Sequence, residues 1–257
     1  MSHDPAISPA SDVLLEVENL SKNFGGVAAV DDVTLQLRAG VISTLVGPNG
    51  AGKTTLFNLI TGHLPADSGD VRWKGQSIKG MKPWQIARRG ICRTFQDLRL
   101  FSHMTVADNV LCVMEDSFLP WQPGGFSAAR ERRERVQQIL EETHLADKAK
   151  VRAVDLSYAE RKFLSLARIM ATDGEIWLLD EPASGLDPRS FSLFLNLLKS
   201  NVKKGITVCI IEHNLDIVFS LSDRVAFLDR GKLLAEDDPE TVLKDPHLVS
   251  IYFGERN

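Results

Sequence analysis

The sequence of 257 residues predicts an α/β protein. Short runs of apolar and β-branched residues recur along the chain, as expected for strands, and other segments have apolar residues at the spacing of a helix. A glycine-rich stretch lies between one such strand and one such helix. The middle of the chain has helical rather than strand patterns. Together these observations favour an α/β core with an α-rich insertion.

Each expected element follows from its local pattern. Strands are indicated at residues 13–17, 33–37, 41–46, 71–73 (as an edge strand), 91–95, 175–179, 207–211 and 224–228. Helices are indicated at residues 53–62, 84–89, 104–114 and 128–145. In the last helix Val136, Ile139 and Leu140 lie on one face. Residues 96–152 contain only expected helices and loops, which makes an insertion of about 60 residues in the α/β core.

The composition is that of an ordinary globular protein, with 44% hydrophobic and 25% charged residues. The formal net charge of −4 argues against nucleic acid as the main partner. The three cysteines are scattered, which favours a reducing compartment over a disulfide framework. No run approaches the ~18 apolar residues of a transmembrane helix. Residues 1–11 lack the apolar segment of a secretory signal and are expected to form a disordered tail, so we expect a soluble protein.

Residues 47–55 read GPNGAGKTT and are the most informative stretch. A strand before and a helix after give it the context of a phosphate-binding loop, in which glycines point backbone N–H groups inward and the helix start adds partial positive charge. Lys53 can reach the β- and γ-phosphates, and the Thr54 hydroxyl can ligate Mg²⁺. The alternative is a glycine-rich turn with a solvated lysine. The expected phosphate-binding residues are Gly47, Asn49, Gly50, Gly52, Lys53, Thr54 and Thr55.

A second signal is the apolar run IWLLDEP, which ends in Asp180 and Glu181. Ligands of open α/β sheets bind at the carboxyl ends of the strands, so both carboxylates can face the nucleotide. Asp180 would hold Mg²⁺ through a water, and Glu181 would orient or deprotonate the attacking water. The alternative is a pair of acids that caps the strand end, which is weaker beside a phosphate loop.

Two other polar residues follow expected strands. His213, in IIEHN, can contact a γ-phosphate if its strand lies beside the nucleotide, although a lone histidine is usually structural or solvated. Gln96, in TFQDLRLF, also lies at a strand end. The run ASGLDP, residues 183–188, comes directly after the acids.

In this order the motifs resemble the nucleotide-binding domain of ATP-binding cassette (ABC) proteins, over about residues 13–254. The resemblance implies a P-loop NTPase fold with a RecA-like core, an antiparallel β-subdomain and an α-helical subdomain. It implies an ABC ATPase domain over residues 12–240, with the helical subdomain inserted at about 97–165, and a family-specific tail over 241–257. In this family two domains sandwich two ATP molecules. Each site combines the phosphate loop of one subunit with the signature motif of the other.

Further roles come from this resemblance. Phe24, in KNFGG, looks like the aromatic residue that stacks on adenine, with core packing as the alternative. Gln96 looks like the residue that links Mg²⁺ and the attacking water to the membrane partner, and Asp187 like the acid that contacts the opposite site. His213 looks like the γ-phosphate switch. Catalytic roles are thus expected for Lys53, Gln96, Glu181 and His213, and metal binding for Thr54, Gln96 and Asp180.

The signature departs from the family pattern, since the usual LSGGQ reads LSYAE at residues 156–160. Ser157 is retained and is expected to contact the partner's nucleotide. Ala159 replaces a glycine whose backbone approaches the partner's γ-phosphate, and a methyl group is compatible with a negative φ there but not easily with a positive one. Glu160 places a negative charge near phosphate. We expect slower hydrolysis rather than none, because the expected catalytic set is complete.

Longer stretches, such as FGGVAAVDDVTLQLRAG and RRGICRTFQDLRLFSHMTVADNV, resemble the ATPase subunits of bacterial branched-chain amino acid importers. This resemblance implies ATP and Mg²⁺ as cofactors, and a location on the cytoplasmic face of the inner membrane. It implies two integral membrane permease subunits, a second paralogous ATPase or a second copy, and indirectly a solute-binding protein as partners. The expected contacts for a permease coupling helix, or alternatively for packing within the insertion, are Gln96, Leu98, Leu100, Phe101 and Met104.

Two alternatives stay open. The altered signature would suit a weakly hydrolysing partner in an asymmetric dimer. A soluble ABC ATPase of translation or DNA metabolism usually has two cassettes or a long coiled-coil insertion, and this sequence has neither. A P-loop kinase or GTPase does not account for the order of Gln96, residues 184–187 and His213.

Overall fold

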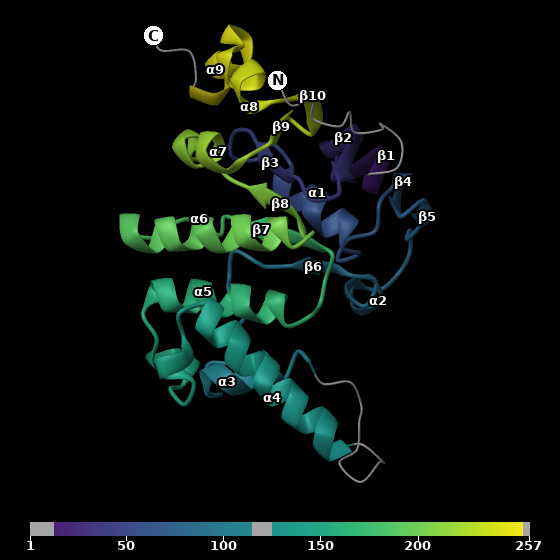
Figure 1. The fold of residues 1–257 in the computed structure, drawn as a ribbon. Coiled ribbons are helices and arrows are strands. Elements are labelled where there is room, and N and C mark those ends of the chain that lie inside the picture. Colours follow the sequence, from purple (N-terminus) through teal and green to yellow (C-terminus); the bar gives the residue numbers. More distant parts are fainter. Residues whose placement is uncertain (1–12, 115–124, 254–257) are drawn as a thin grey trace, which may run out of the picture.

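The structure, a computed structural model, describes residues 13–114 and 125–253. They form an antiparallel sheet of order β2-β1-β4-β5 and a six-stranded sheet of order β10-β9-β3-β8-β7-β6 (Figure 1). In the larger sheet β9, β3, β8, β7 and β6 are parallel, and β10 pairs with β9 in the antiparallel sense. The strands are β1 (Val13–Phe24), β2 (Val27–Arg38), β3 (Ile42–Val46), β4 (Ser68–Trp73), β5 (Gln76–Ser77), β6 (Ile91–Arg93), β7 (Ile176–Asp180), β8 (Thr207–Ile211), β9 (Arg224–Asp229) and β10 (Lys232–Asp237).

The helices are α1 (Lys53–Ile60), α2 (Pro83–Ala87), α3 (Val106–Leu111), α4 (Gly125–Glu142), α5 (Tyr158–Met170), α6 (Pro188–Lys203), α7 (Leu215–Leu221), α8 (Pro239–Lys244) and α9 (Pro246–Phe253). In Figure 1, α3 and α4 lie at one end of the molecule and α8 and α9 at the opposite end. Among the residues that the structure describes, no helix has the length and apolar character needed to cross a bilayer.

The large sheet separates two apolar cores. Trp177 and Leu179 of β7 pack with helices α3 to α6 on one face. Ile176 and Leu178 of the same strand pack with α1 and the antiparallel sheet on the other face. This alternation follows from the two-residue period of a strand. Every residue of β7 and β8 is buried, because parallel strands in such a sheet are covered on both faces. The sheet is therefore a rigid base for residues that follow its strand ends.

The α/β class is confirmed, and each expected strand overlaps a strand of the structure. The expected strand over residues 13–17 continues to Phe24. The edge position expected for residues 71–73 is wrong, because β5 covers β4 on that side and a strand of two residues has no periodicity to detect. The segment between β6 and β7 is helical in its described part, while the tail expected over residues 1–11 lies outside the described residues.

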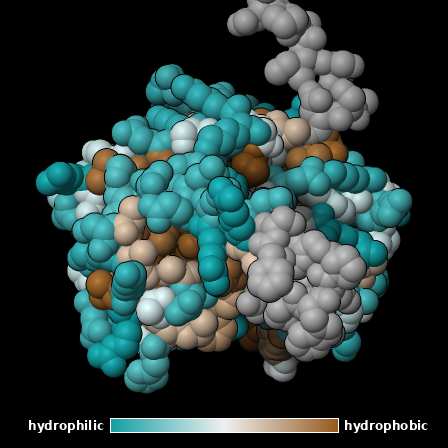
Figure 2. All heavy atoms as spheres, turned by 60° about the horizontal axis from the view of Figure 1, so that its bottom comes forward, coloured by the Kyte–Doolittle hydropathy of each residue, from teal (hydrophilic) through white to brown (hydrophobic). Residues whose placement is uncertain are grey.

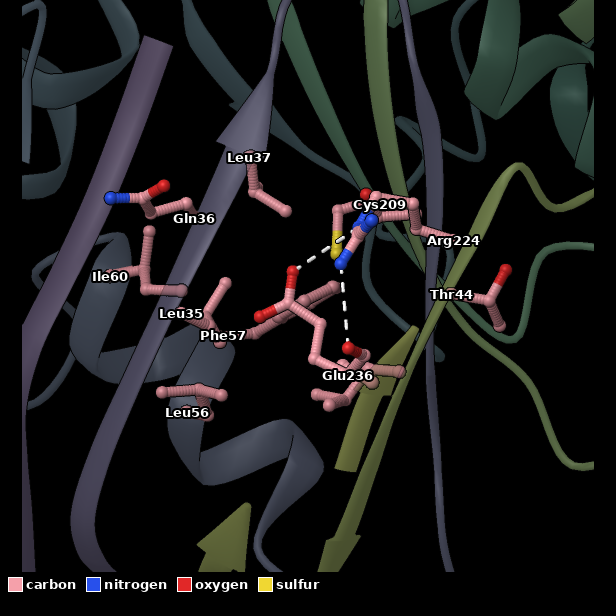
Figure 3. Close-up of a pocket in the computed structure, with 13 residues that line it drawn as sticks. Leu35, Gln36, Leu37, Thr44, Leu56, Phe57, Ile60, Cys209, Arg224 and Glu236 are labelled. Carbon is pink, nitrogen blue, oxygen red and sulfur yellow. Dashed lines mark hydrogen bonds and ion pairs between the residues drawn. The ribbon is translucent and has the colours of Figure 1, made fainter. Parts of the chain in front are cut away.

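A cavity of about 20 Å³ lies between the two sheets, beside α1 (Figure 3). Its lining is mostly apolar, but Arg224 and Glu236 meet there, with Nε and Oε1 3.5 Å apart. Burial raises the pKa of Glu236, against the opposing effect of the Arg224 guanidinium. A space of this size holds one water at most, so it is not a ligand site.

Candidate functional site

The glycine-rich loop joins β3 to α1, as the sequence predicts. Gly52 is the N-cap of α1 and has no side chain to cap it, so the first N–H groups of the helix are available to an anion. Lys53 is buried, and its Nζ donates to the carbonyl oxygens of Gly47 at 2.7 Å and Pro48 at 2.9 Å. Burial lowers the pKa of Lys53, against the opposing effect of Glu181 and Asp180.

Two glycines of the loop press against neighbouring backbone. Gly47 has φ +145°, and a Cβ there would lie 1.9 Å from the carbonyl oxygen of Leu228. Gly52 has φ +103°, and a Cβ there would lie 2.1 Å from the carbonyl oxygen of Ala29. The loop is therefore fixed between β2 and β9, whereas a Cβ at Gly50 would meet nothing within 4 Å.

We expect Gly52→Ala to lower the free energy of unfolding by about 2 kcal/mol or more, because both the backbone conformation and the contact with Ala29 become unfavourable. Gly50→Ala is the matched control, since φ is +81° but the space is open. It should cost about 1 kcal/mol. Urea denaturation without nucleotide measures both; equal losses would contradict the close approach at Gly52.

Three expected catalytic residues meet at the carboxyl end of the sheet. Gln96, Glu181 and His213 follow β6, β7 and β8, which are neighbours in the sheet. Gln96 Nε2 donates to Glu181 Oε2 at 3.3 Å, and His213 Nδ1 lies 3.7 Å from Glu181 Oε1. The strand order thus brings together side chains that are far apart in the sequence.

Asp180 is buried and directly precedes Glu181 in the sequence. Its Oδ2 accepts a hydrogen bond from Arg93 Nη2 at 3.1 Å, and Arg93 also donates to Asn58 Oδ1 at 2.6 Å. Burial raises the pKa of Asp180, against the opposing effect of Arg93. The sequence reasoning missed Arg93, although an arginine within the apolar strand 91–95 was a possible signal.

The residues expected to hold Mg²⁺ fit that ion. Thr54 is exposed in the first turn of α1, Asp180 is the last residue of β7, and Gln96 follows the neighbouring strand β6. Hydroxyl, carboxylate and amide oxygens are the ligands of a hard cation that keeps several waters and binds phosphate. The described residues contain no group of three or more His, Cys, Asp or Glu that could hold a metal ion.

The altered signature forms the start of α5. Ser157 is the N-cap, and its backbone N–H donates to Glu160 Oε2 at 2.8 Å. Ala159 lies inside the helix and is not among the residues with positive φ, so its methyl group causes no backbone strain. The Glu160 carboxylate also pairs with Lys148. Although burial acts in the opposite sense, these contacts lower the pKa of Glu160.

The structure shows the surroundings of Phe24 and Asp187, whose roles are implied by the resemblance. Phe24 is 47% exposed at the end of β1, which excludes core packing, and stacking on adenine stays a prediction. Asp187 is the N-cap of α6, where its Oδ1 accepts from the N–H groups of Arg189 and Ser190 at 3.0 and 3.1 Å. Its contact with an opposite site also stays a prediction.

A second residue missed by the sequence reasoning is Glu212, which is 1% exposed. It accepts hydrogen bonds from the N–H groups of Ala183 at 3.4 Å and His213 at 3.3 Å. Burial raises the pKa of this carboxyl group. An acid directly after an apolar strand, and next to His213, was the available signal.

Comparison with known proteins identifies relatives of this chain. The sequence profile described as "ABC transporter" matches residues 30–184. The chain is 37% identical to the high-affinity branched-chain amino acid transport ATP-binding protein BraF of Pseudomonas aeruginosa, over 94% of this chain and 98% of that protein. It is also 37% identical to the protein of the same description, LivG, of Escherichia coli, over 95% of this chain and 99% of that protein.

Solved structures agree in fold. An ATP-binding cassette of an ABC transporter in its ADP conformation superposes with a TM-score of 0.82 and 33% identity, covering 95% of this chain and 99% of that one. A nucleotide-free ATP-binding cassette superposes with a TM-score of 0.83 and 32% identity, covering 95% of this chain and 100% of that one.

Proposed function

The chain belongs to the ABC transporter family of ATP-binding proteins, and from this premise we propose that it binds and hydrolyses ATP to power an importer of branched-chain amino acids or a related small solute. The observation that carries the proposal is the meeting of Gln96, Glu181 and His213, in which the Glu181 carboxylate also acts electrostatically on Lys53 of the phosphate loop. The solute class is supported by BraF and LivG, which match nearly the whole chain and are named as branched-chain amino acid transport proteins.

The residues divide the chemistry between them. The loop N–H groups and Lys53 bind the phosphates, and Phe24 stacks on the base. Thr54, Asp180 and Gln96 would hold Mg²⁺, which neutralises charge on the phosphates when bound. Glu181 accepts a proton from the attacking water, and His213 contacts the γ-phosphate. ATP binding favours a closed dimer, because ATP contacts both halves only in that state.

The partners proposed are two permease subunits, a second ATPase or a second copy, and indirectly a solute-binding protein. Support for the permease contact comes from the α3–α4 end of the molecule, where Figure 2 shows hydrophobic residues within a mostly hydrophilic face. Phe101 is 49% and Val154 42% exposed. Their segments are joined, since the N–H of Val154 donates to the carbonyl of Ser102 at 2.9 Å. This arrangement would place the protein on the cytoplasmic face of the inner membrane.

Uptake of labelled leucine, isoleucine and valine tests the proposed function. A strain that lacks this gene should take up less of at least one solute, and the wild-type gene should restore uptake. The Glu181→Gln gene should not. If loss of the gene changes no uptake of these or related solutes, the importer assignment is wrong.

Ala159 favours one second candidate, a weakly hydrolysing partner in an asymmetric dimer. Its methyl group stands where the family has a glycine near the partner's phosphate, although the backbone there is helical. If the methyl group crowds the phosphate, Ala159→Gly should raise the turnover of the assembled complex by about threefold. The steady-state rate of phosphate release measures this, and an unchanged rate would show that Ala159 does not slow hydrolysis.

A further inference from the structure

Lys162 is a charged side chain almost completely buried in α5, with 4% of its surface exposed. Its Nζ donates a hydrogen bond to the backbone carbonyl oxygen of Glu181 at 2.6 Å. Burial of an ammonium group is costly unless a partner replaces water, and here a peptide oxygen does so. The proposed chemistry uses the carboxylate of Glu181 but gives Lys162 no role.

The acceptor belongs to a peptide in an unusual conformation. Glu181 has φ +46°, in the left-handed region, which a residue with a side chain adopts only where its surroundings hold it. Its N–H donates to the carbonyl oxygen of Ile211 at 3.0 Å. The backbone of Glu181 is therefore held on one side by β8 and on the other by Lys162. This conformation directs its carboxylate toward Gln96 and His213.

Lys162 also lies two residues after the signature, on the same helix. Its Nζ lies 5.5 Å from the ring centroid of Tyr158, the third signature residue. The Tyr158 ring in turn lies against the loop after β7, where a Cβ added to Gly185 would be 2.9 Å from the ring Cε1. The signature helix therefore contacts the segment that carries Glu181 at two points.

We propose that Lys162 is a positioning residue, which fixes the backbone of Glu181 and couples the catalytic carboxylate to the signature helix of the same chain. The proposal rests on the proposed function, in which each signature contacts the nucleotide bound by the partner. A movement of α5 on nucleotide binding at one composite site then reaches Glu181 of the other site through the Lys162 hydrogen bond.

The test is Lys162→Met in the full-length chain, assayed with its copurifying subunits. Methionine has a similar length and tolerates burial but cannot donate a hydrogen bond. We expect kcat for ATP to fall about 10- to 100-fold, while KM for ATP changes less than about threefold, because a small displacement of a catalytic group affects the chemical step. Lys162→Arg, which keeps a donor and the charge, should recover most of the loss.

Lys199→Met is the matched control. Lys199 also donates from a helix to a backbone carbonyl, that of Ser220 at 2.9 Å, but it is exposed on α6. The same chemical change there should leave kcat within about twofold of the wild type.

A double-mutant cycle with Glu181→Gln separates positioning from a general structural role. Glutamine leaves the backbone carbonyl in place, so the Lys162 hydrogen bond persists in that variant. If Lys162 acts through the carboxylate, Lys162→Met should change the single-turnover rate of Glu181→Gln by less than about twofold.

Three results would overturn the proposal: an unchanged kcat in Lys162→Met, an equal fold-loss in both backgrounds, or a folded Lys162→Arg as slow as Lys162→Met. Thermal denaturation and ATP affinity of each variant identify those that fold. If Glu181→Gln alone retains full turnover, the hydrolytic role in the proposed function fails, and that result is distinct from any failure of Lys162.

Discussion

Replacement of Glu181 by glutamine is expected to lower ATP turnover by about 100- to 1,000-fold while ATP binding is retained. The glutamine amide has the shape of the carboxylate and keeps an oxygen near Gln96, whose Nε2 lies 3.3 Å from Glu181 Oε2. The amide cannot, however, accept a proton from the attacking water. Steady-state phosphate release gives the turnover, and isothermal titration with ATP gives the affinity. Slow hydrolysis with intact binding should also accumulate the closed dimer, visible by size-exclusion chromatography.

Glu175→Gln is the control for this substitution. Glu175 comes directly before β7, at the opposite end of the strand from Glu181, and forms an exposed ion pair with Lys74. Its replacement should leave turnover within about twofold, as for most surface substitutions. Full activity in Glu181→Gln would exclude Glu181 as the base and would favour the partner ATPase as the active site.

Replacement of Lys53 by methionine is expected to weaken ATP binding by about 30-fold or more and to abolish measurable turnover. The charged Nζ is buried under the loop and donates to two of its carbonyl groups, at Gly47 and Pro48. Loss of a charge-assisted hydrogen bond of this kind costs about 2 kcal/mol, and the phosphates also lose their cationic partner. Titration with ATP measures the affinity.

Lys74→Met serves as its control, because Lys74 is exposed and paired only at the surface. An exposed ion pair contributes less than about 1 kcal/mol, so affinity for ATP should not change. If Lys53→Met binds ATP as tightly as the wild type, with an unchanged unfolding midpoint, then the loop does not bind the phosphates through this lysine.

The part of the site that follows strand ends could be predicted from the sequence. Glu181 and His213 each come one residue after the end of an apolar run, behind Asp180 and Glu212. Neighbouring parallel strands end at the same edge of a sheet. The glycine-rich loop could be predicted equally well, because its residue types are determined by backbone geometry and by the chemistry of phosphate binding. These features depend on local pattern and on one general property of parallel sheets.

Contacts between distant elements could not be predicted in the same way. Arg93 meets Asp180, and Lys162 meets Glu181, only because β6, α5 and β7 pack together in three dimensions. Asp187 is expected from the resemblance to contact an opposite site, and the structure adds that its carboxylate caps α6. Nothing in the spacing of these residues distinguishes a buried partner from a solvated charge, so their roles emerge from packing alone.

The C-terminal elements were missed for a different reason. The strand β10 alternates only weakly, and α8 and α9 have six and eight residues, too short for a clear helical period. In the structure Val242 and Leu248 of these helices pack against Val46, Val218 and Phe227. These helices are stabilised by this apolar contact with the sheet rather than by their own helix propensity.

The central claim is that this chain is the ATPase of a membrane transporter, and purification of the tagged protein from detergent-solubilised membranes tests it most directly. Bound proteins are identified by mass spectrometry, and the ATP turnover of the purified complex is measured. The account predicts two multi-span membrane proteins, together with a second ATPase subunit or a second copy of this chain, in a complex that hydrolyses ATP. Recovery of soluble proteins alone, under conditions that preserve other membrane complexes, would contradict the transporter assignment.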